Sequence, residues 1–308
     1  MAKTEKYKGT HFKPSAGDRV FSVLNGTFFA LFTLVCIFPI YYLFINTISD
    51  NSLVASGQVN LYPRGIHFNN YVKLLNVNDL ATSVFVTLGR TVLGTASMVL
   101  ASAFVGYLVT QKKMFARTFI YRAIIVTMYF NAGLIPWYLN MSMLGLTNNF
   151  MGYVIPAIIS PFNIILVKTY IESIPAELEE SAFIDGAGYF TVFRALMLPL
   201  SKPILATIAV FGAVGHWNSF TDSIILMGSE PKLYTLQHRL YIYLTSSSNL
   251  GKLMEGGSTL TASMVESVLN NRVISLTVSM ITIVPILLVY PYMQRYFQKG
   301  IMMGAVKG

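Results

Sequence analysis

The stretch VFSVLNGTFFALFTLVCIFPIYYLFINTIS, residues 20–49, contains no charged side chain. A membrane-spanning helix needs roughly 20 mostly apolar residues, so this stretch is long enough to cross a bilayer. A secretory signal peptide has a shorter apolar core followed by small residues, whereas this stretch ends with bulky residues that include Tyr41, Tyr42 and Phe44. We therefore expect a retained first transmembrane helix.

The composition of the whole chain also indicates that it lies in a lipid bilayer. Of its 308 residues, 54% are hydrophobic and only 11% are charged, and the mean hydropathy is +0.57. A typical soluble domain has about one quarter charged residues. Burying so much apolar surface in water would require a very large core for a chain of this length. A soluble enzyme is therefore nearly excluded, and lipid is the expected environment.

Five further apolar segments complete the predicted membrane domain. They cover residues 83–109, 118–139, 150–167, 203–227 and 273–294. The polar turn NMSMLGLTNN at 140–149 separates the third helix from the fourth. We expect an all-α polytopic membrane protein with six transmembrane helices. Residues 1–20 form an N-terminal segment, 21–296 the transmembrane domain and 297–308 a C-terminal tail.

The distribution of charge predicts the orientation of these helices. Six spans place both termini on one side, and that side carries 15 of the 22 Lys and Arg residues. Because basic loops stay in the cytoplasm, both termini are expected there, with the protein in the cell membrane. The net charge of +9 is then a topology signal and does not indicate nucleic-acid binding. The residues at 228–271 form a long outer loop, a candidate contact for an extracytoplasmic partner.

Several chemical motifs are absent. There is no phosphate-binding G-x-x-x-x-G-K-[ST] loop, no H-E-x-x-H and no nucleophile elbow. The single cysteine, Cys36, lies in an apolar run and is expected to be a packing residue. The four histidines fall in different segments. We expect no catalytic residues, no metal site and no cofactor held by this chain.

The segment ESIPAELEESAFIDGAGYFTVFRALMLPLSKP, residues 172–203, is unusual because it combines acidic and apolar residues on the predicted inner side. Pro175 suits a helix start, and the carboxylates that follow favour the positive end of a helix. Gly186 and Gly188 permit a sharp reversal before a second short helix that is expected to stop at Pro199. Such an elbow either docks a soluble partner or merely links two spans.

This segment resembles the EAA loop of ABC-importer permeases, which reads E-A-A, two residues, D-G-A and a later L-P. The matching residues are Glu180, Ser181, Ala182, Asp185, Gly186, Ala187, Leu198 and Pro199. Ser181 stands where the family usually has alanine. The resemblance implies a type I importer permease fold whose loop sits in a groove of a separate ATPase subunit. It implies that Glu180 pairs with basic groups of the ATPase, and that Gly186 permits the bend while Ala182 and Ala187 pack closely.

Other stretches resemble the maltose-type carbohydrate permeases, in the branch associated with oligosaccharides. They include GLIP at 133–136, LGLTN at 144–148 and VGHWN at 214–218. The resemblance implies that the tail residues Gly304, Ala305, Val306, Lys307 and Gly308 contact the ATPase. It also implies a heterodimer with a second homologous permease, two ATPase subunits that hold ATP and Mg²⁺, and an extracytoplasmic binding protein that delivers the sugar.

Polar residues in the predicted spans are candidates for the lining of the translocation path, because such residues at membrane depth face protein or water. The candidates are His216, Trp217, Asn218 and Asp222, with Asn131, Trp137 and Asn163 as weaker ones. Trp217 could stack on a sugar ring. Interhelical hydrogen bonding is an equal alternative for this group. Arg90 is expected to extend to the outer surface, and lining the path is the less favoured alternative.

Two alternatives to sugar import stay open at this point. The same architecture could import another solute, such as an amino acid, peptide or anion. A secondary transporter driven by an ion gradient would belong to another class, and it usually shows inverted repeats or interrupted helices near the midplane. Neither feature is evident in the sequence.

Overall fold

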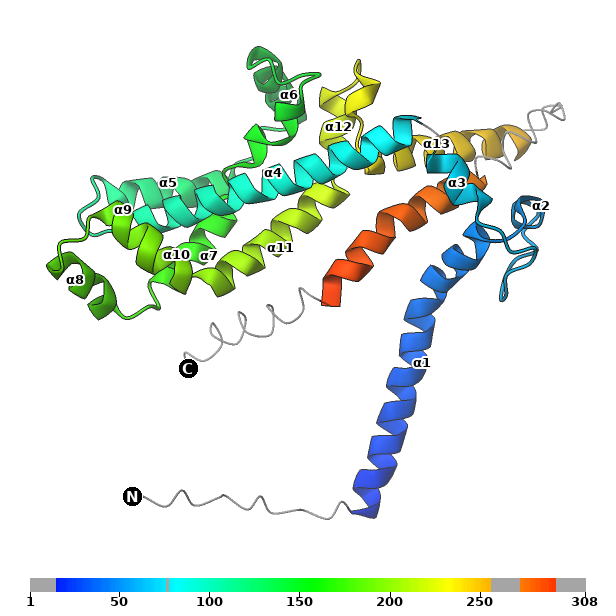
Figure 1. Ribbon diagram of the computed structural model, residues 1–308, viewed down its shortest axis with the longest axis horizontal. Coiled ribbons are helices and arrows are strands. Elements are labelled where there is room, and N and C mark those ends of the chain that lie inside the picture. The colour runs from blue at the N-terminus through cyan, green and yellow to red at the C-terminus, as the bar shows by residue number, and fades with distance from the viewer. Residues whose placement is uncertain (1–14, 76–77, 256–271, 292–308) are drawn as a thin grey trace. The chain divides into compact units, whose positions relative to one another are not determined.

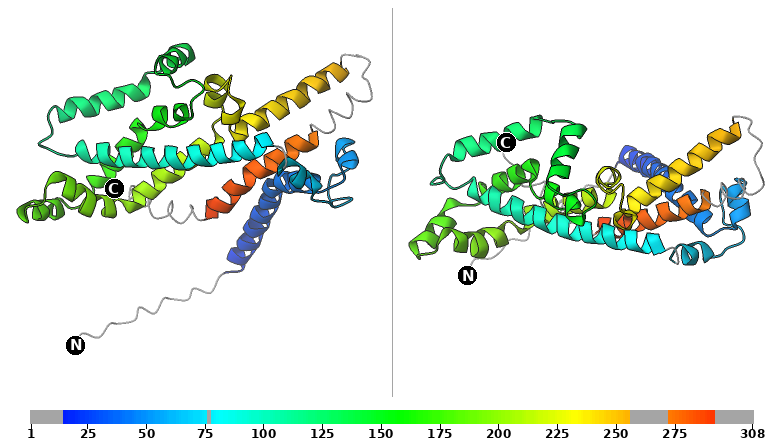
Figure 2. Two further views of the ribbon diagram at one scale, coloured as in Figure 1. Left: turned by 45° about the horizontal axis from the view of Figure 1, so that its top comes forward. Right: turned by 90° about the horizontal axis from the view of Figure 1, so that it is seen from above.

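The computed structural model describes residues 15–75, 78–255 and 272–291. Within these residues the regular secondary structure is helical, and the chain divides into two compact units, residues 1–67 and 68–308 (Figures 1 and 2). The tail 297–308 lies outside the described residues. The expected all-helical fold is confirmed.

The first unit is built on the long helix α1, Ala16–Thr47. Its start is fixed by a capping box, in which the Ser15 side chain accepts a hydrogen bond from the helix and Asp18 accepts one from Ser15 N at 2.9 Å. Such a cap satisfies backbone N–H groups that have no partner inside the helix. The predicted first span is therefore confirmed, with a beginning four residues further upstream.

A short capped helix follows α1. Asp50 caps α2, Asn51–Ala55, by accepting hydrogen bonds from the side chain and backbone of Ser52 and from the backbone of Leu53. These hydrogen bonds hold the pKa of the Asp50 carboxyl below its usual value. The chain then returns, because His67 N donates to Ile48 O at 2.8 Å.

The second unit is organised around α4, Asn78–Leu108, which packs against α7, Pro161–Ile171, and α11, Lys202–Asn218 (Figure 1). A glycine permits close approach of α4 and α11. A Cβ atom added at Gly94 would lie 2.5 Å from the ring of His216. Small residues at such crossings let helix backbones pack tightly within a membrane.

Three helices are long and apolar enough to cross a membrane by themselves: α1, the residues Leu80–Leu108 of α4, and Arg272–Pro291. Three further candidates are pairs of helices joined at a bend, so the described residues hold up to six spans. Helical segments lie at all six predicted spans, but the third bent pair, Tyr189–Leu200 with Lys202–Asn218, begins upstream of the predicted fifth span at 203–227.

The predicted third helix, 118–139, shows the sharpest correction. It consists of α5, Arg117–Tyr129, and α6, Leu134–Met143, which meet at 120°. The break has a local cause, because the side chain of Asn131 accepts a hydrogen bond from Gly133 N at 2.9 Å. Gly133 has φ +87°, a conformation that glycine adopts readily.

The predicted fourth and fifth helices are also interrupted. The fourth begins with two 3₁₀ segments, Phe150–Tyr153 and Ile155–Ala157, which meet α7 at 44°. The fifth ends at Asn218 as α11 and resumes as α12, Thr221–Leu226. A continuous helix would have paired the backbone N–H and C=O groups at these positions with one another, and each break interrupts that pairing.

The elbow at 172–203 forms largely as predicted. Its first helix is α8, Ala176–Ile184, and its second begins with α9, Tyr189–Val192. The predicted stop at Pro199 is wrong, because a π-helical turn, Phe193–Met197, leads into α10, Leu198–Leu200. Proline is tolerated there near the start of α10. A bend of 77° then separates this helix from α11.

Three elements remain. They are α3, Asn69–Leu75, the 3₁₀ segment Pro231–Leu233 and α13, Leu236–Glu255. Because α13 lies within residues 228–271, this region is helical over much of its length, and its position on the outer side stays a prediction. Residues 256–271 lie outside the described part of the chain.

Candidate functional site

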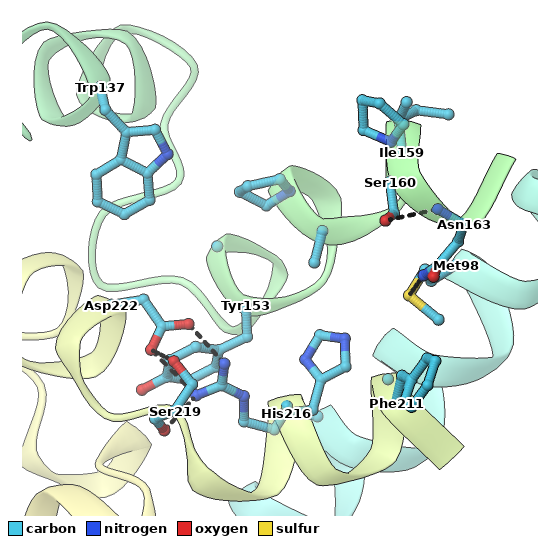
Figure 3. A pocket seen from close by; sticks show the side chains of 17 residues that line it. Met98, Trp137, Tyr153, Ile159, Ser160, Asn163, Phe211, His216, Ser219 and Asp222 are labelled. Carbon is cyan, nitrogen blue, oxygen red and sulfur yellow. Dashed lines mark hydrogen bonds and ion pairs between the residues drawn. The ribbon is translucent and has the colours of Figure 1, made fainter. Parts of the chain in front are cut away.

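A cavity of about 500 Å³ is lined by residues of α4, α6, α7, α11 and α12 and of the 3₁₀ segments before α7 (Figure 3). This volume falls within the range of roughly 300–1,000 Å³ that small-molecule sites occupy. Most of the lining is apolar or aromatic. The polar side chains of the lining come from Arg90, Tyr153, Ser160, Asn163, His216, Ser219 and Asp222.

One wall of the cavity is an ion pair between α4 and α12. The Arg90 guanidinium donates to both carboxylate oxygens of Asp222, at 3.2 and 2.5 Å, and to Ser219 O at 3.1 Å. The side chain of Arg90 is 2% exposed and that of Asp222 is 21% exposed. The guanidinium also lies over the ring of Tyr153, 4.5 Å from its centroid. The expectation that Arg90 extends to the outer surface is therefore wrong.

Asp222 is fixed by more than its cationic partner. Its Oδ1 accepts hydrogen bonds from Ser219 Oγ and Ser223 N, both at 3.0 Å. These contacts span the gap between the end of α11 and the start of α12. The pair therefore ties the break in the fifth span to α4, and its two charges cancel.

A hydrogen-bond network extends from this wall toward α13. The Tyr153 hydroxyl donates to Leu233 O at 2.7 Å and lies 2.8 Å from Ser223 Oγ. Ser223 Oγ in turn lies 2.9 Å from Nδ1 of His238. Burial, with a smaller contribution from Arg239, lowers the pKa of His238 to about 4, so its ring is neutral at physiological pH.

Four of the predicted path residues line this cavity, and Trp137 of α6 is one of them. His216 and Asn163 are buried at its wall, and Asp222 forms the ion pair. Asn163 Nδ2 lies 3.2 Å from the sulfur of Met98, which ties α7 to α4. Figure 3 shows His216 between the ion pair and Asn163.

Three other predicted path residues do not line the cavity. Trp217 is 8% exposed, packs against Leu236, and donates from Nε1 to Thr282 O at 3.0 Å, so it is a packing residue. Asn218 is exposed and accepts from Gln237. Asn131 caps the break before α6.

Sequence reasoning missed Tyr153 and the pairing of Arg90 with Asp222. A signal for the pairing was present, because each is a lone charge of opposite sign in an otherwise apolar segment. Charged residues at membrane depth usually pair with one another. Nothing in the sequence marks Tyr153 among the 18 tyrosines.

The elbow at 172–203 is a second candidate site, separate from the cavity. Glu179 of α8 accepts hydrogen bonds from the Tyr107 hydroxyl at 3.0 Å and from Gln111 Nε2 at 2.9 Å, which fastens α8 to the end of α4. Glu180 is exposed beside it. The predicted coupling residues divide accordingly. Exposed ones are Glu180, Ser181, Asp185, Gly186 and Pro199, whereas Ala182 and Ala187 pack partly buried against the core that contains Tyr107.

The comparisons with known proteins agree over nearly the whole chain. Residues 10–303 match the family described as "Binding-protein-dependent transport system inner membrane component". The polygalacturonan/rhamnogalacturonan transport system permease protein YtcP of Bacillus subtilis is 31% identical, covering 94% of this chain and 99% of the relative. The arabinooligosaccharides transport system permease protein AraQ of Halalkalibacterium halodurans is 26% identical, covering 91% and 94%.

A solved structure matches equally broadly. It is a chain from the crystal structure of a bacterial ABC transporter involved in the import of the acidic polysaccharide alginate. It superimposes with a TM-score of 0.80 at 31% identity, covering 94% of this chain and all of the other. The chain therefore belongs to the family of inner membrane components of binding-protein-dependent transport systems.

Proposed function

We propose that this chain is a permease subunit of an ATP-driven importer that carries a sugar or oligosaccharide across the cell membrane. The observation that carries this proposal is the similarity along the whole chain, at 31% identity, to a permease named for polygalacturonan and rhamnogalacturonan. The alginate importer supports the same solute class. These relatives favour a sugar over an amino acid or peptide.

Membership of this family argues against an ion-driven secondary transporter. The interrupted helices do not overturn this argument, although they are a feature expected of such transporters. The breaks at Gly133 and Ser219 are explained by local hydrogen bonds and by the ion pair. ATP depletion distinguishes the two classes, because uptake by an importer of this family stops without ATP.

The proposed assembly has one permease of this sequence, a second homologous permease, two ATPase subunits and an extracytoplasmic binding protein. ATP and Mg²⁺ are held by the ATPase subunits. The elbow at 172–203 faces the cytoplasm, as do both termini, and Glu180 contacts the ATPase. Glu180 and Asp185 are exposed, whereas Ala182 packs against the core. This arrangement supports a position of α8 in which its acidic side chains contact the ATPase. The tail 304–308 is proposed to contact the ATPase as well.

Reconstitution of the complete complex in proteoliposomes tests the proposal. We expect uptake of a short oligogalacturonate or arabino-oligosaccharide that requires both ATP and the binding protein. Glu180→Ala and Gly186→Pro should abolish uptake while the subunits still insert. The function would be wrong if the intact complex took up neither sugar, and the coupling assignment would be wrong if the variants took up sugar at the wild-type rate.

A further inference from the structure

Of the two tryptophans in the chain, only Trp137 lines the cavity. It is half-buried on α6, the segment that the 120° bend turns away from the direction of α5. Figure 3 shows its indole extending from α6 toward the cavity, with Asp222 and Ser219 on the opposite side. The indole packs in part against the core that contains Tyr153, and the bend places it in the same cavity lining as the polar wall.

The polar wall has unused hydrogen-bonding capacity. Nε of Arg90 is buried without a hydrogen-bond partner. Oδ2 of Asp222 accepts from Arg90 and has room for a second hydrogen. A buried donor without a partner costs free energy, so a ligand hydroxyl that reaches it after a small local movement is favoured.

The electrostatics of this wall restrict the kind of group that it holds. Arg90 and Asp222 neutralise each other, and Asp222 is held in place by Ser219 and Ser223. A ligand carboxylate at this wall would be attracted by Arg90 and repelled by Asp222, so the two interactions would oppose each other. Uncharged hydroxyls can bind to both members of the pair.

We propose that this cavity binds one ring of the transported saccharide, with the C–H face of the ring on Trp137 and its hydroxyls on the Arg90–Asp222 pair. The inference rests on the proposed sugar import and adds the binding site within this subunit. An aromatic face and a few polar groups suit a sugar ring, which has an apolar face and a hydroxyl rim. The site recognises hydroxyls and takes neutral and acidic rings alike.

The test uses the complete complex with its binding protein and two probes, a short oligogalacturonate and an arabino-oligosaccharide. Trp137→Ala should lower uptake per ATP hydrolysed about fivefold to tenfold for whichever probe is transported, and Trp137→Phe should retain most of it. Leu139→Ala is the matched control, since Leu139 is exposed on the same helix and does not line the cavity. Equal uptake by Trp137→Ala and wild type would overturn the inference.

A second measurement reports binding directly. The only native cysteine is removed by Cys36→Ser, and Ala157→Cys then places a thiol in the cavity lining. Sugar-loaded binding protein should slow labelling of this thiol by a methanethiosulfonate reagent more than sugar-free binding protein does. Phe115→Cys, at an exposed position outside both the cavity lining and residues 228–271, should show no such difference.

The outcomes separate the two levels of inference. If the wild-type complex transports sugar but loaded and sugar-free binding protein protect the cavity thiol equally, the site is wrong and the proposed function stands. If the wild-type complex transports neither probe, the proposed function fails and the site fails with it. If Arg90→Lys lowered uptake of the acidic probe alone, the claim that the site recognises hydroxyls rather than charge would be overturned.

Discussion

Removal of one member of the Arg90–Asp222 pair should destabilise the protein more than removal of both. Breaking a buried ion pair by deleting one partner typically costs about 3–5 kcal/mol, because a charge is left uncompensated. Replacing both partners by apolar residues of similar size is often neutral or stabilising. The structure also predicts which single variant is the worse one.

The two partners differ in what remains when the other is removed. In Asp222→Leu, Arg90 is 2% exposed and keeps only Ser219 O and the ring of Tyr153, so a loss near 5 kcal/mol is expected. In Arg90→Met, Asp222 is 21% exposed and keeps hydrogen bonds from Ser219 and Ser223, so a loss near 3 kcal/mol is expected. The double variant should lie within about 1 kcal/mol of the wild type.

The assay is the temperature at which half of the detergent-solubilised complex loses its monodisperse elution peak, measured for the wild type, both single variants and the double variant. The expected order of stability is wild type and double variant together, then Arg90→Met, then Asp222→Leu. Because 1 kcal/mol shifts the unfolding temperature of a domain of 150–250 residues by roughly 2–4 °C, the gap of about 2 kcal/mol between the single variants should appear as a shift of several degrees. Additive losses in the double variant would show that the two charges are not coupled and would refute this reasoning.

Three further outcomes are expected. Glu179→Gln should lower transport per ATP hydrolysed severalfold, because the neutral side chain holds α4 less strongly, while Glu177→Gln, at an exposed position, should not. Gly94→Ala should cost about 1–3 kcal/mol of thermal stability in the elution assay, because the added methyl must displace the ring of His216. The pKa of His238 is lowered to about 4, so between that pH and about pH 6.5 the unfolded chain binds a proton at this residue and the folded chain does not. The contribution of His238 to stability should therefore be constant above about pH 6.5 and fall toward pH 4. His238→Gln should reduce this fall in a series of elution measurements across that range.

The membrane segments could be predicted from the sequence because uninterrupted apolar runs leave few alternatives. The run at 20–49 appears as α1, which ends at Thr47, and the run at 83–109 appears as α4, which ends at Leu108. The bends could not be predicted in the same way. The break before α6 depends on a side-chain cap by Asn131 and a positive φ at Gly133, and both residues also occur within continuous helices.

The site illustrates a different limit. Hydropathy indicates that Trp137 and Trp217 lie near the membrane, but which of them faces the cavity depends on the direction in which α6 turns after its bend. Similarly, Arg90 and Asp222 are 132 positions apart in the chain, and only the packing of α4 beside α11 brings them together. The elbow was more predictable, because its proline, carboxylates and glycines act on the backbone within a few residues.

One consequence of the fold concerns the two ends of α4. Arg90 and Tyr107 are seventeen residues apart on one helix, which at 1.5 Å per residue separates the ion pair from the α8 contact by about 26 Å. Proline, the usual cause of a sharp kink, is absent from α4. A displacement of α8 that preserves the hydrogen bonds to Glu179 therefore carries the end of α4 with it, and a stiff α4 transmits that movement to Arg90. Weakening the Glu179 contact should accordingly separate ATP hydrolysis from sugar movement without disturbing the cavity itself.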